Sequence, residues 1–206
     1  SQGRHIIIAV FFTNLKEINM KKSYLLMALL PFLFVAVAQA HGPVRQKVDE
    51  EITINAPAAK VWGIIKEYND MSWLPPVKST NGKGGNAEGA TRTLTLQNGG
   101  TITEELKKYD DAGMTYAYKI TDMSSDKTIN HAGADVKVPV IPVDNYAATI
   151  KVEDKGGSSQ VTWKAGFYRA YTNNNPPPEM NEEAANTAIN GIFKAGLDNL
   201  KKLAEK

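Results

Sequence analysis

Alternating apolar and polar residues predict β-strands along most of the chain. In residues 48–55, Ile52 and Ile54 fall on one face, which is typical of a half-buried strand. Glycine-containing turns separate the later segments of this kind. The expected strands span 48–55, 77–83, 90–97, 101–109, 114–121, 145–154 and 159–169. Residues 136–143 are apolar but contain two prolines, which favours an edge strand or a rim segment.

Helical spacing of apolar residues appears near both ends of this run of strands. Pro57 favours the start of a helix over 58–68, and 69–76 predicts a second short helix or turn that two prolines end. Residues 179–206 predict one long helix whose apolar stripe includes Ile189 and Phe193. The polar segment 122–135 has no clear period and is expected to be a loop. A single antiparallel sheet with helices on one side is an α+β fold.

The first forty residues are expected to lie outside this fold. Residues 20–40 combine a Lys-Lys start, an uncharged apolar stretch and an Ala-Gln-Ala end, the pattern of a secretory signal peptide cleaved after Ala40. An uncleaved N-terminal anchor is the alternative. Residues 1–19 precede a complete signal and are interpreted as an upstream, non-native extension, or else as a second apolar element too short to span a membrane. Residues 41–206 are then one exported domain, expected in a bacterial periplasm without a stable membrane anchor.

Composition narrows the classes of function. The 206 residues carry 24 Lys and Arg against 22 Asp and Glu, and residues 41–206 carry 20 against 21. This balance argues against a nucleic-acid partner. The absence of cysteine excludes disulfides, thiolate zinc sites and cysteine nucleophiles, and three histidines argue against a multi-histidine metal site. We therefore expect no metal, and no motif implies a cofactor.

Several segments, in order along the chain, resemble a known superfamily. They are INAPAAKVWGII (54–65), MSWLPPV (71–77), EGATRTLTLQNGGTITEEL (88–106), TYAYKI (115–120), PVDNYAATIKVE (142–153) and VTWKAGFYR (161–169). The chain is similar here to the SRPBCC or START-like superfamily, also called Bet v 1-like or polyketide cyclase/dehydrase. The resemblance implies a helix-grip fold, in which a curved antiparallel sheet surrounds a long C-terminal helix and a cavity, with two short helices after the first strand.

A narrower resemblance is to the MxaD-like periplasmic branch. It lies in HGPVRQKV (41–48), SWLPPV (72–77) and NNPPPEMNEEAA (174–185). It implies an association with quinoprotein methanol dehydrogenase and its cytochrome c acceptor. Residues 122–137 depart from the family pattern because they look longer than the usual link between these strands.

Strand alternation gives the cavity one candidate pair of charges. Arg92 shares a face with Leu94, and Glu104 shares a face of the next strand with Ile102 and Leu106. These faces are expected to point inward, where the two charges could pair and shift the pKa of the carboxylate. The pair has three interpretations: a structural ion pair, a ligand contact, or a proton-transfer site like the Arg and Glu of plant enzymes in this superfamily.

Aromatic residues supply the other candidates. Aromatic side chains with a polar group suit a ligand pocket but equally suit an ordinary core. Trp73 lies beside two prolines at the implied cavity mouth, where it could contact a ligand or partner or pack locally. Asn145 is expected in a turn first and at the cavity second. The expected cavity residues are Trp73, Arg92, Leu94, Glu104, Tyr116, Tyr118, Asn145, Tyr146, Trp163 and Phe193.

Three functions follow as hypotheses. The first is a periplasmic accessory protein of methanol oxidation that docks to the dehydrogenase or the cytochrome. Its near-neutral charge argues against electrostatic steering, so docking would use aromatic rim residues such as Trp73. The second is a carrier of a small apolar ligand, such as a lipid or a quinone-like molecule. The third is an enzyme of the cyclase, dehydratase or isomerase type that uses Arg92 and Glu104.

Overall fold

The structure is a computed structural model that describes residues 42–206. The expected extension (1–19), the signal peptide (20–40) and His41 lie outside the described residues. Among the described residues, no helix is long and apolar enough to cross a membrane.

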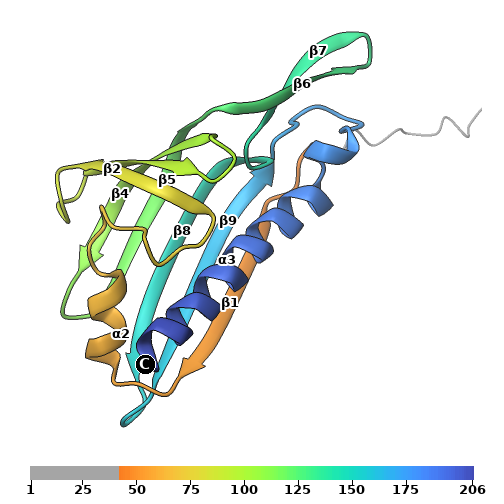
Figure 1. Ribbon diagram of the computed structural model, residues 1–206. Coiled ribbons are helices and arrows are strands. Elements are labelled where there is room, and N and C mark those ends of the chain that lie inside the picture. The colour runs from red at the N-terminus through yellow and green to blue at the C-terminus, as the bar shows by residue number, and fades with distance from the viewer. Residues whose placement is uncertain (1–41) are drawn as a thin grey trace, which may run out of the picture. The chain divides into compact units, whose positions relative to one another are not determined.

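Seven antiparallel strands form one sheet in the order β1-β9-β8-β5-β4-β3-β2 (Figure 1). Each expected strand is present, with ends that differ by a few residues. The strands are β1 (Gln46–Ile54), β2 (Val77–Lys83), β3 (Thr91–Leu96), β4 (Thr101–Asp110), β5 (Thr115–Met123), β8 (Val143–Asp154) and β9 (Ser159–Arg169). Because β1 pairs with β9, the first and last strands of the chain are neighbours.

The long C-terminal helix lies along one face of this sheet (Figure 1). One long helix was expected over residues 179–206. The structure instead has a short 3-10 turn, η2 (Pro178–Met180), followed by helix α3 (Glu182–Ala204). Asn181 separates the two, and its side-chain oxygen accepts a hydrogen bond from the Ala184 amide at 2.8 Å. An asparagine cap of this kind satisfies one of the free amides at a helix start. The apolar stripe of α3, which includes Ile189 and Phe193, is buried.

Only one helix follows the first strand, rather than the two that were expected. Helix α2 (Ala58–Ile65) begins after Pro57 and buries the face that carries Trp62. Residues 69–76 form turns instead of a second helix. Asp70 accepts a hydrogen bond from the Ser72 amide at 2.9 Å, which fixes a turn, and the two prolines that follow supply no amide for a helix.

The segment expected as a loop, 122–135, is mostly a β-hairpin. Strand β5 continues to Met123, and β6 (Ser125–His131) and β7 (Ala134–Pro139) then form a separate two-stranded sheet. Ala132 and Gly133 join them with positive φ angles of 51° and 79°, which is the geometry of a type I′ hairpin turn. The prediction was wrong because β6 is exposed along most of its length and therefore shows no alternation of apolar residues.

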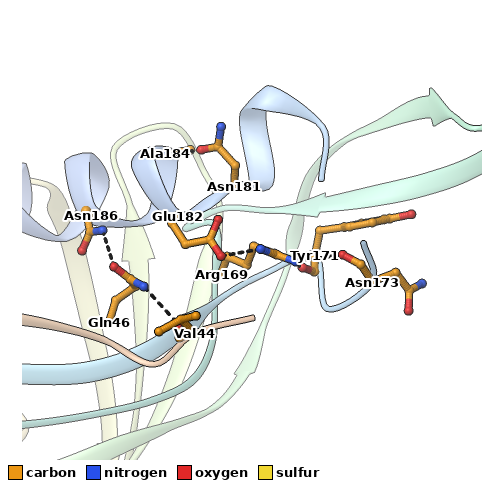
Figure 2. A network of polar contacts seen from close by, with 9 residues as sticks. All are labelled: Val44, Gln46, Arg169, Tyr171, Asn173, Asn181, Glu182, Ala184 and Asn186. Carbon is orange, nitrogen blue, oxygen red and sulfur yellow. Dashed lines mark hydrogen bonds and ion pairs between the residues drawn. The ribbon is translucent and has the colours of Figure 1, made fainter. Parts of the chain in front are cut away.

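Buried Arg169 links the end of β9 to the start of α3 (Figure 2). Its guanidinium donates to the carbonyls of Tyr171 and Asn173 at 2.7 and 2.9 Å and pairs with the Glu182 carboxylate. Nearby, Asn186 of α3 donates to Gln46 of β1 at 2.8 Å (Figure 2). These bonds fix where α3 begins on the sheet, and therefore which of its residues face the interior.

Candidate functional site

Arg92 and Glu104 lie directly opposite each other on β3 and β4. The Arg92 Nε donates to the Glu104 Oε2 at 2.6 Å, and the two residues are 1% and 5% exposed. The ion pair expected from strand alternation is therefore present and buried. A charge-assisted hydrogen bond of this length is among the stronger interactions in a protein interior.

The rest of the Arg92 guanidinium is also held. One terminal nitrogen donates to the Tyr68 carbonyl at 2.8 Å. The guanidinium carbon lies 4.1 Å from the centre of the Tyr68 ring and 5.0 Å from that of Tyr118, distances at which a cation is attracted to an aromatic ring. Arg92 is therefore a fixed positive charge, and it orients Glu104.

Burial raises the pKa of the Glu104 carboxyl above its usual value, and the neighbouring Arg92 charge and hydrogen bond oppose that rise. Removing a carboxylate from water disfavours its ionised form, whereas an adjacent cation favours it. Because the effect of burial outweighs that of Arg92, Glu104 exchanges its proton at a higher pH than an exposed glutamate does. The group is therefore suited to accept a hydrogen bond when ionised or to donate one when protonated.

Glu104 faces an interior cavity of about 40 Å³. This volume is far below the roughly 300–1,000 Å³ of pockets for drug-sized ligands, so the cavity admits a small group unless its walls move. Of the described residues that line it, Glu104 alone carries a charge. The lining residues are Met71, Leu74, Pro76, Val77, Leu94, Leu96, Ile102, Glu104, Tyr118, Ile120, Ile141, Tyr146, Trp163, Ile189, Ile192 and Phe193.

Hydrogen-bonded aromatic residues form one wall of the cavity. The Trp163 indole Nε1 donates to the Tyr118 hydroxyl at 3.1 Å, and the Trp163 ring stacks on Phe193 of α3 with centroids 4.0 Å apart. Burial raises the pKa of Tyr146, and the neighbouring Tyr118 hydroxyl partly offsets that rise. The Tyr118 and Tyr146 ring centroids lie 6.2 Å apart, so the aromatic wall continues from Trp163 through Tyr118 to Tyr146.

Six of the ten expected residues line the cavity: Leu94, Glu104, Tyr118, Tyr146, Trp163 and Phe193. Arg92 and Tyr116 are buried but do not line it. Tyr116 instead packs against other aromatic rings, including Trp62 and Tyr68.

The expected rim residues are placed differently. Trp73 is only 1% exposed and packs on Trp163 with ring centroids 5.4 Å apart. Of its two expected roles, the structure therefore shows local packing rather than an exposed partner contact, and Trp73 does not line the cavity. Trp73 is buried because α3 packs directly on it. The backbone of α3 at Gly196 lies so close that an added Cβ atom would be 3.2 Å from the Trp73 ring. Asn145 is exposed and lies outside the interior cavity.

Sequence reasoning named Phe193 of α3 but missed the other lining residues from α3 and from the turns, and it also missed Val77, Leu96, Ile102, Ile120 and Ile141. Met71, Leu74 and Pro76 lie in the turns after α2, where no periodicity reveals a face. Ile189 and Ile192 belong to the apolar side of the predicted C-terminal helix, and their spacing from Phe193 was a usable signal. In residues 42–206, no group of three or more His, Cys, Asp or Glu side chains is placed to hold a metal ion.

Comparison with known proteins adds a family. The profile of the family described as "Polyketide cyclase / dehydrase and lipid transport" matches residues 45–205. Among curated proteins, no sequence matches the chain.

Solved structures show the same fold. The protein XoxI from Bacillus cereus is 26% identical, with a TM-score of 0.60 over 77% of this chain and 94% of its own. The Zhui aromatase/cyclase from a Streptomyces species is 16% identical, with a TM-score of 0.57 over 79% of this chain and 94% of its own. Norcoclaurine synthase from Thalictrum flavum, in complex with dopamine and hydroxybenzaldehyde, is also 16% identical, with a TM-score of 0.55 over 78% of this chain and 87% of its own.

Proposed function

Since the chain belongs to the polyketide cyclase / dehydrase and lipid transport family, we propose that it binds a small, mostly apolar ligand in the interior cavity, with one polar group of the ligand against Glu104. The observation that carries this proposal is the half-satisfied carboxylate of Glu104 in an apolar wall. Arg92 donates to Oε2, and no described residue donates a hydrogen bond to Oε1.

The chemistry of the walls supports a ligand of this class. Leucine, isoleucine and aromatic side chains surround most of the cavity, so a ligand gains affinity there by removing apolar surface from water. A buried polar group costs free energy unless it finds a hydrogen-bond partner. Glu104 offers that partner at a fixed position, which selects for ligands with a hydrogen-bonding group at one end.

The test is a titration of isotope-labelled residues 42–206 with n-butanol and n-hexanol, followed by two-dimensional amide NMR. We expect saturable shifts of the Trp163 indole signal, and weaker binding of both alcohols by Glu104→Gln. Glu105→Gln is the matched control, because Glu105 is the next residue and pairs with Lys107 at the surface. A Trp163 signal that does not move with either alcohol would refute the proposal.

A proton-transfer enzyme is the second candidate, with Glu104 as acid or base and Arg92 as the fixed charge. The raised pKa of Glu104 favours it. A cyclase, dehydratase or isomerase of this kind would remove a proton from carbon next to a carbonyl. Incubation with cyclohexanone in heavy water is expected to replace C–H by C–D faster than buffer alone does, and the acceleration should disappear in Glu104→Gln but persist in Glu105→Gln. Equal exchange with and without protein would count against this candidate.

The accessory role in methanol oxidation is a third, finer proposal that rests on the MxaD-like segments. Residues 174–185, which carry part of that resemblance, form the connector and the first turn of α3. Because Trp73 is buried, docking would have to use exposed residues such as Glu183 of that turn. The measurement is methanol-dependent reduction of cytochrome c by methanol dehydrogenase, with and without the purified protein. An unchanged rate would remove this role.

A further inference from the structure

The main sheet is split at one end, between β5 and β8. The hydrogen-bonded ladder between these strands ends at the pair Lys119 and Ala147. Strand β5 continues to Met123 on β4 alone, and β8 begins at Val143 on β9 alone. Over these residues the two strands are neighbours in the sheet order without pairing, because the chain leaves β5 to form the β6–β7 hairpin before it returns as β8 (Figure 1).

A bulge in β8 borders the split. The β8–β9 register shifts between Asp144 and Ala147, and Asn145 has a φ angle of 47°, in the left-handed region. Asp144 and Asn145 therefore both face solvent, whereas Tyr146 turns inward and is 5% exposed. Bulges often redirect one side chain in this way beside functional sites.

A surface depression of about 230 Å³ occupies the split. Its lining residues are Ile120, Thr121, Asp122, Met123, Pro139, Val143, Asp144, Asn145 and Tyr146. Ile120 and Tyr146 also line the interior cavity, so the two spaces share these two residues. Asn145, which was expected first in a turn and second at the cavity, lines this outer depression instead.

We propose that the interior cavity and this depression are the two halves of one ligand site, with Tyr146 between them. The inference rests on the proposed ligand binding and names the class of ligand. A short apolar chain occupies the inner half, whose walls move apart to admit it because the cavity measures only about 40 Å³. The inner end of this chain carries the polar group that Glu104 binds, and a second polar group, the head group, occupies the larger outer half. In the proposed site the Tyr146 hydroxyl is the donor at the junction, because Tyr146 lines both spaces.

The charges around the outer half select the head group. Two carboxylates, Asp122 and Asp144, line the depression, and no Lys, Arg or His is among its described lining residues. An alcohol accepts a hydrogen bond from Tyr146, and an amine is attracted by the carboxylates. A carboxylate head group is repelled. The ligand is therefore a small amphiphile with a hydroxyl or amine head, and fatty acids are disfavoured.

The experiment compares 1,6-hexanediol, 6-amino-1-hexanol and 6-hydroxyhexanoate, which share one chain and one terminal hydroxyl for Glu104 and differ in the head group at the other end. Two-dimensional amide NMR of labelled residues 42–206 follows the Trp163 indole for the inner half and the Asn145 amide for the outer half. We expect 1,6-hexanediol and 6-amino-1-hexanol to shift both signals with one affinity. For 6-hydroxyhexanoate we expect at least about threefold weaker binding at low salt, a difference that shrinks when salt screens the exposed carboxylates.

Variants separate the head-group contacts from general effects on folding. Tyr146→Phe should weaken the binding of 1,6-hexanediol by about fivefold, the value of one lost hydrogen bond. Tyr168→Phe, at a residue outside both spaces, should not weaken it. Asp144→Asn should reduce the preference for 6-amino-1-hexanol over 6-hydroxyhexanoate. Asp126→Asn, an exposed aspartate on β6, is its control.

Three outcomes would overturn the inference. If the Trp163 indole shifts while the Asn145 amide does not, the ligand occupies the inner half only, and the proposed function stands without the two-part site. If 6-hydroxyhexanoate binds as tightly as 1,6-hexanediol at low salt, the head-group preference is wrong. If neither signal moves with any of the three compounds, ligand binding itself fails, and the two-part site fails with it.

Discussion

Replacing Arg92 by methionine tests whether the buried ion pair organises the site. Arg92 and Glu104 have side chains that are 1% and 7% exposed, with 2.6 Å between the bonded atoms. Unit charges about 4 Å apart attract by about 4 kcal/mol at an effective dielectric constant of about 20. Removing one partner of a buried pair costs about 3–5 kcal/mol, because the remaining charge stays buried without a counter-charge. We expect Arg92→Met to lose this much stability at neutral pH.

The stability that Arg92→Met loses should be larger at high pH than at low pH. Burial already raises the pKa of Glu104, and Arg92→Met removes the charge that opposes the rise. When the pKa of a carboxyl is higher in the folded state than in the unfolded state, its protonated form favours folding. This stabilisation is fully present below the pKa of the unfolded state and is lost as pH rises through the pKa of the folded state. Arg92→Met should therefore be closer to the wild type in stability at about pH 5 than at about pH 8. Urea unfolding followed by tryptophan fluorescence measures both values.

Two further variants make the reasoning refutable. The double variant Arg92→Met with Glu104→Leu leaves no buried charge, and it should recover most of the lost stability or exceed the wild type by about 1–4 kcal/mol. Lys151→Met removes one partner of a surface pair with Glu153 and should cost less than about 1 kcal/mol. A loss below about 1 kcal/mol in Arg92→Met, or a loss that does not change with pH, would show that Glu104 is neither buried nor coupled as described.

Further predictions concern the helix and the aromatic wall. Gly196→Ala should cost about 1–3 kcal/mol of stability, because the new methyl group would lie 2.9 Å from the Trp163 ring. Gly191→Ala meets nothing within 4 Å and should stabilise α3 by up to about 1 kcal/mol. Thermal unfolding measures both variants, and equal changes in their melting temperatures would refute this reasoning. Asn181→Ala should cost about 1 kcal/mol through loss of the helix cap, again by thermal unfolding, and no measurable change would mean that the cap is dispensable. Tyr118→Phe should leave the indole nitrogen of Trp163 without its hydrogen-bond acceptor, at a cost of about 1–3 kcal/mol of stability. The indole NMR signal of Trp163 should then shift, and a signal that does not move would argue against this hydrogen bond.

Local patterns account for most of the fold. Alternation and glycine turns together identified all seven strands of the main sheet. Most of these strands bury one face and expose the other, whereas β2 is largely exposed and was identified by the glycines that follow it. The same rule put Arg92 and Glu104 on inward faces, and the short connection at residues 97–100 made them direct neighbours. The hairpin 125–139 was missed because polar residues on both faces of β6 leave no alternation to detect.

The site was only partly predictable because lining a cavity is not a property of a strand face. Tyr116 and Tyr118 share a face of β5, yet only Tyr118 reaches the cavity. The difference arises where α2, α3 and the turns fill the space above the sheet. Trp73 shows the same limit, since neighbouring prolines suggest exposure and only the position of α3 buries it.

The sequence by itself determined the α+β class, the inward faces and the facing charges of Arg92 and Glu104, because these follow from periodicity and from short connections between neighbouring elements. Only the tertiary structure decided where the sheet splits, which of its inward residues border a void, and that a bulge turns Tyr146 between two spaces. The physical reason is that a void is the space that packing leaves unfilled, and it depends on segments far apart in the chain.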